Sequence, residues 1–198
     1  IDDAARRLVR AQLRFAPRGE PERYHPEAVV SPQHRELALE ASARSLVLLR
    51  NEPPQPESEP VLPIDPARTR SIAVIGELAA IKNLGDLGSS RVHPPNVITV
   101  LDGISDAGER HGIDVHYDDG TDLTSAANLA ARCDSAVTVV GATWRDEGEW
   151  VVAHGGDRRS IRLTAEHEAL VRAAGGANRS QSVVLMGGST FAVDPVER

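Results

Sequence analysis

The 198-residue chain has very few cysteines and lysines, with Cys133 and Lys82 as the single examples of each. One cysteine excludes an internal disulfide framework and a zinc site built from several cysteines. The scarcity of lysine beside 21 arginines is typical of codon bias in a GC-rich genome. We attach no functional meaning to it.

Long apolar runs are also missing. No stretch approaches the about 20 consecutive apolar residues of a membrane helix, and residues 1–16 contain too many Arg and Asp side chains for a signal-peptide core. Acidic residues outnumber basic ones by 29 to 22, and the net charge of -7 disfavours attraction to nucleic acid or anionic lipid. We therefore expect no nucleic-acid partner, no membrane partner and a cytoplasmic location, with secretion or a periplasmic location left open because a leader would precede Ile1.

The N-terminal third of the chain predicts two helices separated by proline-rich segments. Residues 1–16 place apolar side chains at helical spacing on one face and arginines on the other. Prolines interrupt any helical pattern in residues 17–30 and again from Pro53 onward. Between them Ser31, followed directly by a proline, has the pattern of a helix cap and predicts a helix over residues 31–50.

From Ser71 onward, short β-branched runs alternate with longer helical stretches. The predicted strands cover residues 72–75, 113–117, 136–140 and 183–186, and the helices between them lie near residues 97–110, 124–132 and 164–174. This alternation favours an α/β fold with a mainly parallel sheet flanked by helices, because parallel strands need crossover connections and bury both faces. Ligands of such sheets bind beyond the carboxyl ends of the strands, so we expect the chemistry in segments 76–96 and 141–160.

The loop after the third predicted strand is rich in acids and aromatics. Asp146, Glu147 and Glu149 lie between Trp144 and Trp150, two of only six aromatic residues in the chain. Crowding of like charges and burial against indole both disfavour ionisation, so one of these carboxyls is a candidate general acid. Tryptophan also offers a surface on which sugars stack. A solvated acidic loop with two hydrophobic anchors is the alternative that composition alone leaves open.

The loop after the first predicted strand combines small and polar residues. Asp86, Ser89, Ser90 and Arg91 offer donors and acceptors to a polar ligand. A dinucleotide motif is excluded, because a G-x-G-x-x-G loop follows its strand directly and opens a helix, and this glycine-containing loop does neither. The histidines lack metal-ligand spacing, so we expect neither a cofactor nor a metal.

Seven segments follow one another in a specific order across residues 31–195. They read SPQHRELALEASARSLVLLRNE, VLPID, SIAVIGELA, NLGDLGSSRVHPPNVITVLDGI, SAVTVVGATWRDEGEW, GGDRRSIRLTAEHEALVRA and SVVLMGGSTFAVDP. Together they resemble the C-terminal α/β sandwich domain of glycoside hydrolase family 3, the β-glucosidase type. The first helix, IDDAARRLVRAQLRFA, is similar to the last helix of the TIM barrel that precedes the sandwich in that family.

The resemblance implies a division of the chain into three parts. Residues 1–16 correspond to the terminal helix of a missing TIM-barrel domain, and residues 17–66 to a linker that contains the helix at 31–50. Residues 67–198 correspond to an incomplete C-terminal α/β sandwich domain. We therefore expect the chain to be a fragment of a longer protein.

The resemblance also implies a retaining mechanism, with an aspartate nucleophile from the barrel and a glutamate acid/base from the sandwich domain. The matching glutamate is Glu147, which stands before Gly148 with Asp157 and Arg158 downstream. Nine residues separate Glu147 from Asp157, more than in the compact form of the motif, so Glu149 is a rival. We favour Glu147.

The same resemblance suggests roles for the surrounding residues. Asp157 and Arg158 are expected to brace the loop through charge-assisted hydrogen bonds. The segment from Asp86 to Arg91 is expected to wall the leaving-group side of the sugar pocket, where Trp144 offers a stacking surface.

The sequence therefore supports one enzymatic hypothesis and one alternative. The first is part of a retaining β-glycosidase that hydrolyses terminal β-linked sugars, such as a β-glucoside, and is inactive without its barrel domain. The second is a non-catalytic α/β ligand-binding or interaction module that shares the fold without the chemistry. The sugar preference stays open, because the residues that would read the sugar lie mainly in the barrel.

Overall fold

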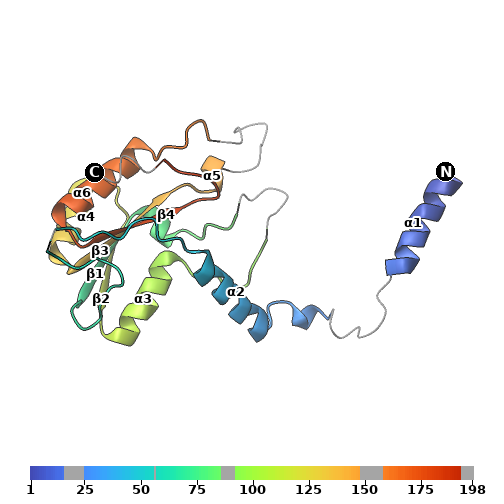
Figure 1. Cartoon of the computed structure of the whole chain (residues 1–198), viewed down its shortest axis with the longest axis horizontal. Helices are drawn as coiled ribbons and strands as arrows, with labels where there is room; N and C mark the ends of the chain where they lie inside the picture. The colour runs from blue at the N-terminus through green and yellow to red at the C-terminus, as the bar shows by residue number, and fades with distance from the viewer. Residues whose placement is uncertain (16–24, 56, 86–91, 148–157, 193–198) are drawn as a thin grey trace. The chain divides into compact units, whose positions relative to one another are not determined.

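The structure is a computed structural model that describes residues 1–15, 25–55, 57–85, 92–147 and 158–192 (Figure 1). The chain divides into two compact units, Ile1–Arg50 and Asn51–Arg198. Within the described ranges, every helix is too short or too polar to cross a membrane. Asp86, Ser89, Ser90, Arg91, Glu149 and Asp157, all singled out in the sequence, lie outside the described residues.

The first unit is helical. It contains α1 (Asp2–Phe15), the short 3-10 helix η2 (Pro26–Ala28) and α2 (Pro32–Ser45). Both predicted helices are confirmed, and Ser31 caps α2 by accepting a hydrogen bond from the backbone N–H of His34 at 3.3 Å. Large apolar side chains of α1, Leu8, Leu13 and Phe15 among them, are exposed.

The second helix ends earlier than the sequence predicts. Helix α2 stops at Ser45, and Leu46 already has extended dihedral angles (φ -70°, ψ 127°). Residues 46–49 are four consecutive large apolar residues, which is a run without helical periodicity. Each of the four side chains is at least 64% exposed.

The second unit is built on a four-stranded parallel sheet (Figure 1). Its strands are β1 (Ser71–Ile75), β2 (Asp114–Asp118), β3 (Ser135–Gly141) and β4 (Gln181–Met186), in the order β2-β1-β3-β4. The crossover helices are α3 (Val100–His111), α4 (Leu123–Arg132) and α6 (Ala165–Ala177). The predicted α/β fold, its strands and its crossover helices are confirmed.

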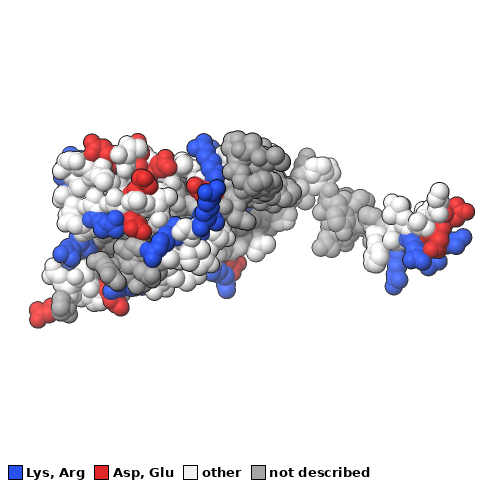
Figure 2. Space-filling model, turned by 90° about the horizontal axis from the view of Figure 1, so that it is seen from above, with Lys and Arg blue, Asp and Glu red and all other residues white. Residues whose placement is uncertain are grey.

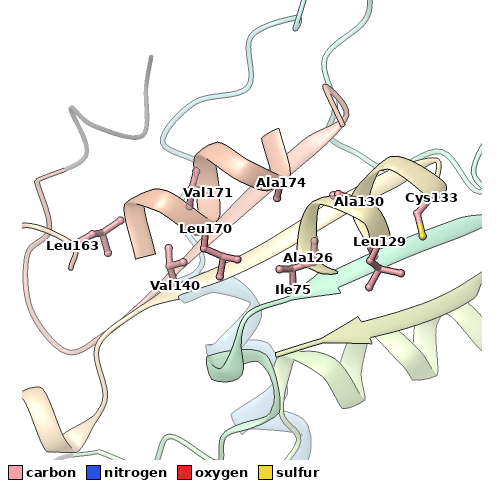
Figure 3. Close-up of a cluster of buried hydrophobic side chains, with 12 residues drawn as sticks. Ile75, Ala126, Leu129, Ala130, Cys133, Val140, Leu163, Leu170, Val171 and Ala174 are labelled. Atoms are coloured by element: carbon pink, nitrogen blue, oxygen red, sulfur yellow. The ribbon is translucent and has the colours of Figure 1, made fainter. Parts of the chain in front are cut away.

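Apolar side chains fill both faces of the sheet. On one face, alternate residues of β1 and β3, such as Ile75 and Val140, pack with Leu129 of α4 and Leu170 of α6 (Figure 3). On the other face, the remaining residues of these strands pack against α3 and against the 3-10 helix η3 (Glu77–Ala80). Strands β1 and β3 are buried on both sides, which accounts for their continuous β-branched sequences.

The sheet contains a topological switch point between its two central strands. The chain leaves β1 through α3 toward β2 and leaves β3 through α6 toward β4, on the opposite side of the central pair. A crevice forms at such a point beyond the carboxyl ends of the strands. The segments after β1 and β3 therefore meet where ligands of this fold class bind.

Two glycines allow the backbone to turn at these strand ends. Gly76 and Gly141 have φ values of +113° and +145°, which residues with a side chain rarely adopt. A Cβ atom on Gly141 would overlap the carbonyl oxygen of Met186, and one on Gly76 would overlap the carbonyl oxygen of Val139. Neighbouring strands can approach this closely because both positions lack a side chain.

Replacing Gly141 should therefore be costly. We expect Gly141→Ala to lower the free energy of unfolding by about 2–5 kcal/mol, through a clash with the main chain and a disfavoured φ. Urea denaturation of the 198-residue chain measures this. The matched control is Gly176→Ala at an exposed position in α6, where a Cβ has no neighbour within 4 Å. This control should stabilise by about 0.5–1 kcal/mol. Equal stability of Gly141→Ala and the parent would contradict the geometry.

A single carboxylate joins the amino ends of β1 and β3. Oδ2 of Asp134 accepts hydrogen bonds from the backbone N–H groups of Arg70 at 2.7 Å and Ser71 at 3.0 Å, and from the Ser71 hydroxyl at 3.3 Å. These hydrogen bonds, led by that from the Arg70 amide, lower the pKa of Asp134 below its usual value. Asp134 therefore favours folding in its ionised form.

The contribution of Asp134 to stability should depend on pH. A pKa lowered in the folded state means that the stabilisation is complete above the unfolded value, about 3.9, and is lost as the pH falls through the folded value. We expect Asp134→Ala to lower Tm at pH 7, and we expect the difference from the parent Tm to shrink as the pH falls below about 3.9, as followed by circular dichroism. Asp114→Ala, which replaces an exposed aspartate at the start of β2, is the control. A Tm difference that is constant with pH would refute this role.

Candidate functional site

The segments that follow β1, β3 and β4 lie at one edge of the sheet, because all the strands are parallel. Residues after β1 form η3, and residues after β3 form the one-turn helix α5 (Trp144–Glu147), which the sequence does not predict. Residues 187–191 follow β4. This edge contains every described residue that the sequence analysis assigns to a site.

Hydrogen bonds between Thr143 and Asp146 shape the turn of α5. The backbone N–H of Thr143 donates to Oδ2 of Asp146 at 2.8 Å, and the N–H of Asp146 donates to the Thr143 carbonyl oxygen at 2.9 Å. The N–H of Glu147 also donates to that carbonyl, at 3.0 Å. Asp146 therefore acts as a local cap, and Glu147 is held at the end of the turn.

The Glu147 side chain points toward the end of β4. Its Oε2 accepts a hydrogen bond from the backbone N–H of Gly188 at 2.6 Å, and its Oε1 accepts one from the Ser189 hydroxyl. Oε1 also lies 2.9 Å from Nε of Arg158, and both side chains of this ion pair are only 13% exposed. We call Glu147, Arg158, Gly188 and Ser189 the Glu147 clamp.

Arg158 makes the larger share of the contacts in the clamp. Its Nη2 donates to the Ser189 hydroxyl at 2.6 Å and to the carbonyl oxygen of Thr190 at 2.7 Å. Its guanidinium lies over the ring of Phe191, 4.1 Å from the ring centre. The Nε–H is not aligned for a hydrogen bond to Glu147, so at Nε the contact is ionic and the directional bonds come from Nη2.

The ion pair of Glu147 and Arg158 is less exposed than ion pairs elsewhere on the surface. Figure 2 shows acidic and basic side chains interspersed over the visible face of the described residues. One such pair, Arg68 and Glu59, has side chains that are 71% and 80% exposed. Exposed pairs of this kind contribute about 0–1 kcal/mol to stability, whereas loss of one partner from a buried pair leaves an uncompensated charge.

A cavity of about 420 Å³ lies at the switch point, next to α5. Glu77 from η3, Trp144 and Asp146 from α5, and Glu166 and His167 from the first turn of α6 contribute to its wall. Hydrogen bonds from its own backbone amide and from the Thr164 hydroxyl lower the pKa of Glu166. The wall thus includes three carboxylates and one indole, groups that can bind hydroxyl-rich ligands, together with aliphatic and basic side chains.

Two side chains in the cavity wall have distinct surroundings. Trp144 is 38% exposed and has the guanidinium of Arg145 over its ring at 5.4 Å. Nδ1 of His167 is buried, and no hydrogen-bond partner for it exists within the described ranges. A search of those same ranges finds no group of three His, Cys, Asp or Glu residues that would hold a metal ion.

The structure brings some of the predicted site residues together. It pairs Glu147 with Arg158. It places Trp144 on the wall of the cavity, whereas Glu147 is not among the described residues that line the cavity. Among the described residues, Glu147 contacts a guanidinium and two hydrogen-bond donors of the clamp. Trp150, one of the two indoles considered in the sequence, lies outside the described residues.

Sequence reasoning missed the residues after β4. Gly188 and Ser189 complete the clamp, and Thr190 and Phe191 contact Arg158. A signal for them was present, because residues 187–191 follow a strand of the same parallel sheet and so belong to the same edge. The sequence-based expectation placed the chemistry only in segments 76–96 and 141–160.

Comparisons with known proteins identify the family. The family model described as Glycosyl hydrolase family 3 C-terminal domain matches residues 46–198. Beta-xylosidase of Formosa agariphila is 29% identical over 210 residues, covering 98% of this chain and 27% of the relative. Beta-D-xylosidase 3 of Arabidopsis thaliana is 32% identical over 171 residues, covering 84% and 20% respectively.

A solved structure agrees with these relatives. The family 3 β-glucosidase of Bifidobacterium adolescentis superposes with a TM-score of 0.66 at 29% identity, covering 83% of this chain and 23% of that chain. The chain spans 27% and 20% of the length of the two curated relatives. Because the family model matches most of the sequence, the chain belongs to glycoside hydrolase family 3 and contains its C-terminal domain.

Proposed function

We propose that this chain is the acid/base-bearing part of a retaining β-glycosidase that removes terminal β-linked sugars. One observation carries the proposal: in a domain whose relatives are glycosidases, α5 ends on Glu147 beyond the carboxyl end of a central parallel strand. Ligands of open α/β sheets bind at this edge. The named relatives include β-xylosidases and a β-glucosidase, so the proposed substrate class is a β-xyloside or β-glucoside.

The proposed enzyme divides its machinery between two domains. A TIM barrel of the same full-length protein supplies the aspartate nucleophile, and residues 1–16 form its last helix. Residues 17–66 are the linker, and residues 67–198 the sandwich domain. A retaining mechanism needs the second carboxyl group about 5–5.5 Å from the nucleophile, on the side of the leaving group. The loop after β3 supplies it, with Trp144 and the segment from Asp86 to Arg91 beside the leaving group.

We further propose that Glu149, and not Glu147, is the acid/base. Both oxygens of Glu147 already accept hydrogen bonds within the domain, and its side chain is only 13% exposed. A general acid must approach the leaving oxygen to about 2.6–3.2 Å. Glu149 follows by two residues, so covalent geometry keeps its Cα within about 7 Å of that of Glu147. This reverses the preference drawn from the sequence.

Kinetics of the full-length gene product test the acid/base. We expect Glu149→Ala to reduce kcat/KM by about 10²–10⁴-fold on an aryl glycoside with a poor leaving group. The loss should be much smaller on dinitrophenyl glycosides, whose leaving group needs no proton, and azide should restore turnover by attacking the glycosyl-enzyme.

Two controls accompany this assay. Glu109→Ala, at an exposed position of α3, should leave both rates unchanged. The 198-residue chain alone should not turn over either substrate. If the unmodified full-length protein hydrolyses no β-glycoside, the proposed function is wrong and a non-catalytic module is the better account.

A further inference from the structure

We propose that Glu147 and Arg158 are positioning residues, whose ion pair fixes the two ends of segment 148–157 against the end of β4. This inference rests on the proposed function, because the segment contains Glu149. In the sequence, Glu147 directly precedes this segment and Arg158 directly follows it. Their charged groups are only 2.9 Å apart although ten residues separate them in sequence.

The contacts of the clamp form a closed ring. The Ser189 hydroxyl accepts a hydrogen bond from Nη2 of Arg158 and donates one to Oε1 of Glu147, which in turn contacts Nε of Arg158. The N–H of Gly188 and the carbonyl oxygen of Thr190 attach this ring to the main chain after β4. Each contact supports the others, so the clamp has a defined geometry.

Steric contacts restrict the same place. A Cβ atom on Gly187 would lie 2.6 Å from the Phe191 ring and 3.2 Å from Oε2 of Glu147. The Phe191 ring also supports the guanidinium of Arg158, 4.1 Å from its centre. The carboxylate and the guanidinium are therefore enclosed by main chain and an aromatic ring as well as bound by hydrogen bonds.

The chemistry of both residues is specific. Every described partner of the Glu147 carboxylate is a donor, so the amide nitrogen of a glutamine would face another donor. Arg158 contacts Glu147, Ser189 and Thr190 from one planar group that also stacks on Phe191. A lysine ammonium cannot reproduce that planar set of contacts. Conservative replacements on either side should therefore break the clamp.

A positioning role makes a prediction that differs from the prediction for an acid/base. A small displacement of a catalytic group costs up to about 10²-fold in rate without changing which group transfers the proton. We expect Glu147→Gln and Arg158→Lys in the full-length gene product each to lower kcat about 10–100-fold. The loss should be the same for good and poor leaving groups, with no rescue by azide and the same acidic and basic limbs of the pH profile.

Further variants separate the clamp from general damage. The double variant Glu147→Gln/Arg158→Lys should lose no more activity than the worse single variant, because each single substitution already disrupts the same clamp. If these variants fold poorly, Ser189→Ala, which deletes one hydroxyl of the clamp, takes their place. We expect its loss of kcat to lie between that of the parent and that of the two single variants. Glu59→Gln and Arg68→Lys, which alter an ion pair whose side chains are both exposed, should leave kcat unchanged.

The outcomes are distinguishable. A loss at Glu147 that grows with the pKa of the leaving group and is rescued by azide would make Glu147 the acid/base and overturn the positioning role. Activity within about twofold of the parent in both single variants, well short of the expected 10–100-fold loss, would also overturn it. Absence of turnover in the unmodified full-length protein refutes the proposed function itself, and with it the positioning role.

Discussion

The parallel pairing of β1 with β3 is the constraint on which the rest of the domain depends. Parallel neighbours need crossover helices, and those helices bury both faces of the two central strands. Since all strands run in one direction, every segment that leaves a carboxyl end emerges at the same edge. The cavity beside α5 and the Glu147 clamp both lie there. The topology of the sheet thus brings both features to one edge.

The fold was predictable because its signals are local. Continuous β-branched runs, as in residues 72–75 and 136–140, identify strands buried on both faces, and the Ser31 cap identifies a helix start. Two failures have equally local causes. Helix α5 is a single turn of four residues and is too short to show helical periodicity. Helix α2 ends at Ser45, just before the apolar run at residues 46–49, which has no helical periodicity. The family resemblance, which rests on seven segments in a specific order along the sequence, is confirmed by the family match.

The site was predictable only in part, because its contacts join residues that are distant in sequence. The acidic composition around Glu147 made this loop a candidate, but it could not show that Arg158 and Ser189 would reach the carboxylate. The guanidinium and the two donors that contact Glu147 come from segments 11 or more residues away in the sequence. Such pairings depend on strand register, which no single segment specifies. Residue types therefore suggest a candidate loop, but they do not show which side chains contact one another there.

The register of β3 against β4 determines where Glu147 lies. Gly141 is paired with Met186, and the next residue, Ala142, donates a hydrogen bond to the Met186 carbonyl oxygen at 2.8 Å. The segments that follow β3 and β4 then leave the sheet side by side, which places the turn of α5 beside Gly188. A side chain on Gly141 would push these strands apart. The position of the Glu147 carboxylate therefore depends on a glycine three residues before α5 begins. The clamp is thus a consequence of the strand ladder, and a proton donor two residues beyond Glu147 would be positioned by the same ladder.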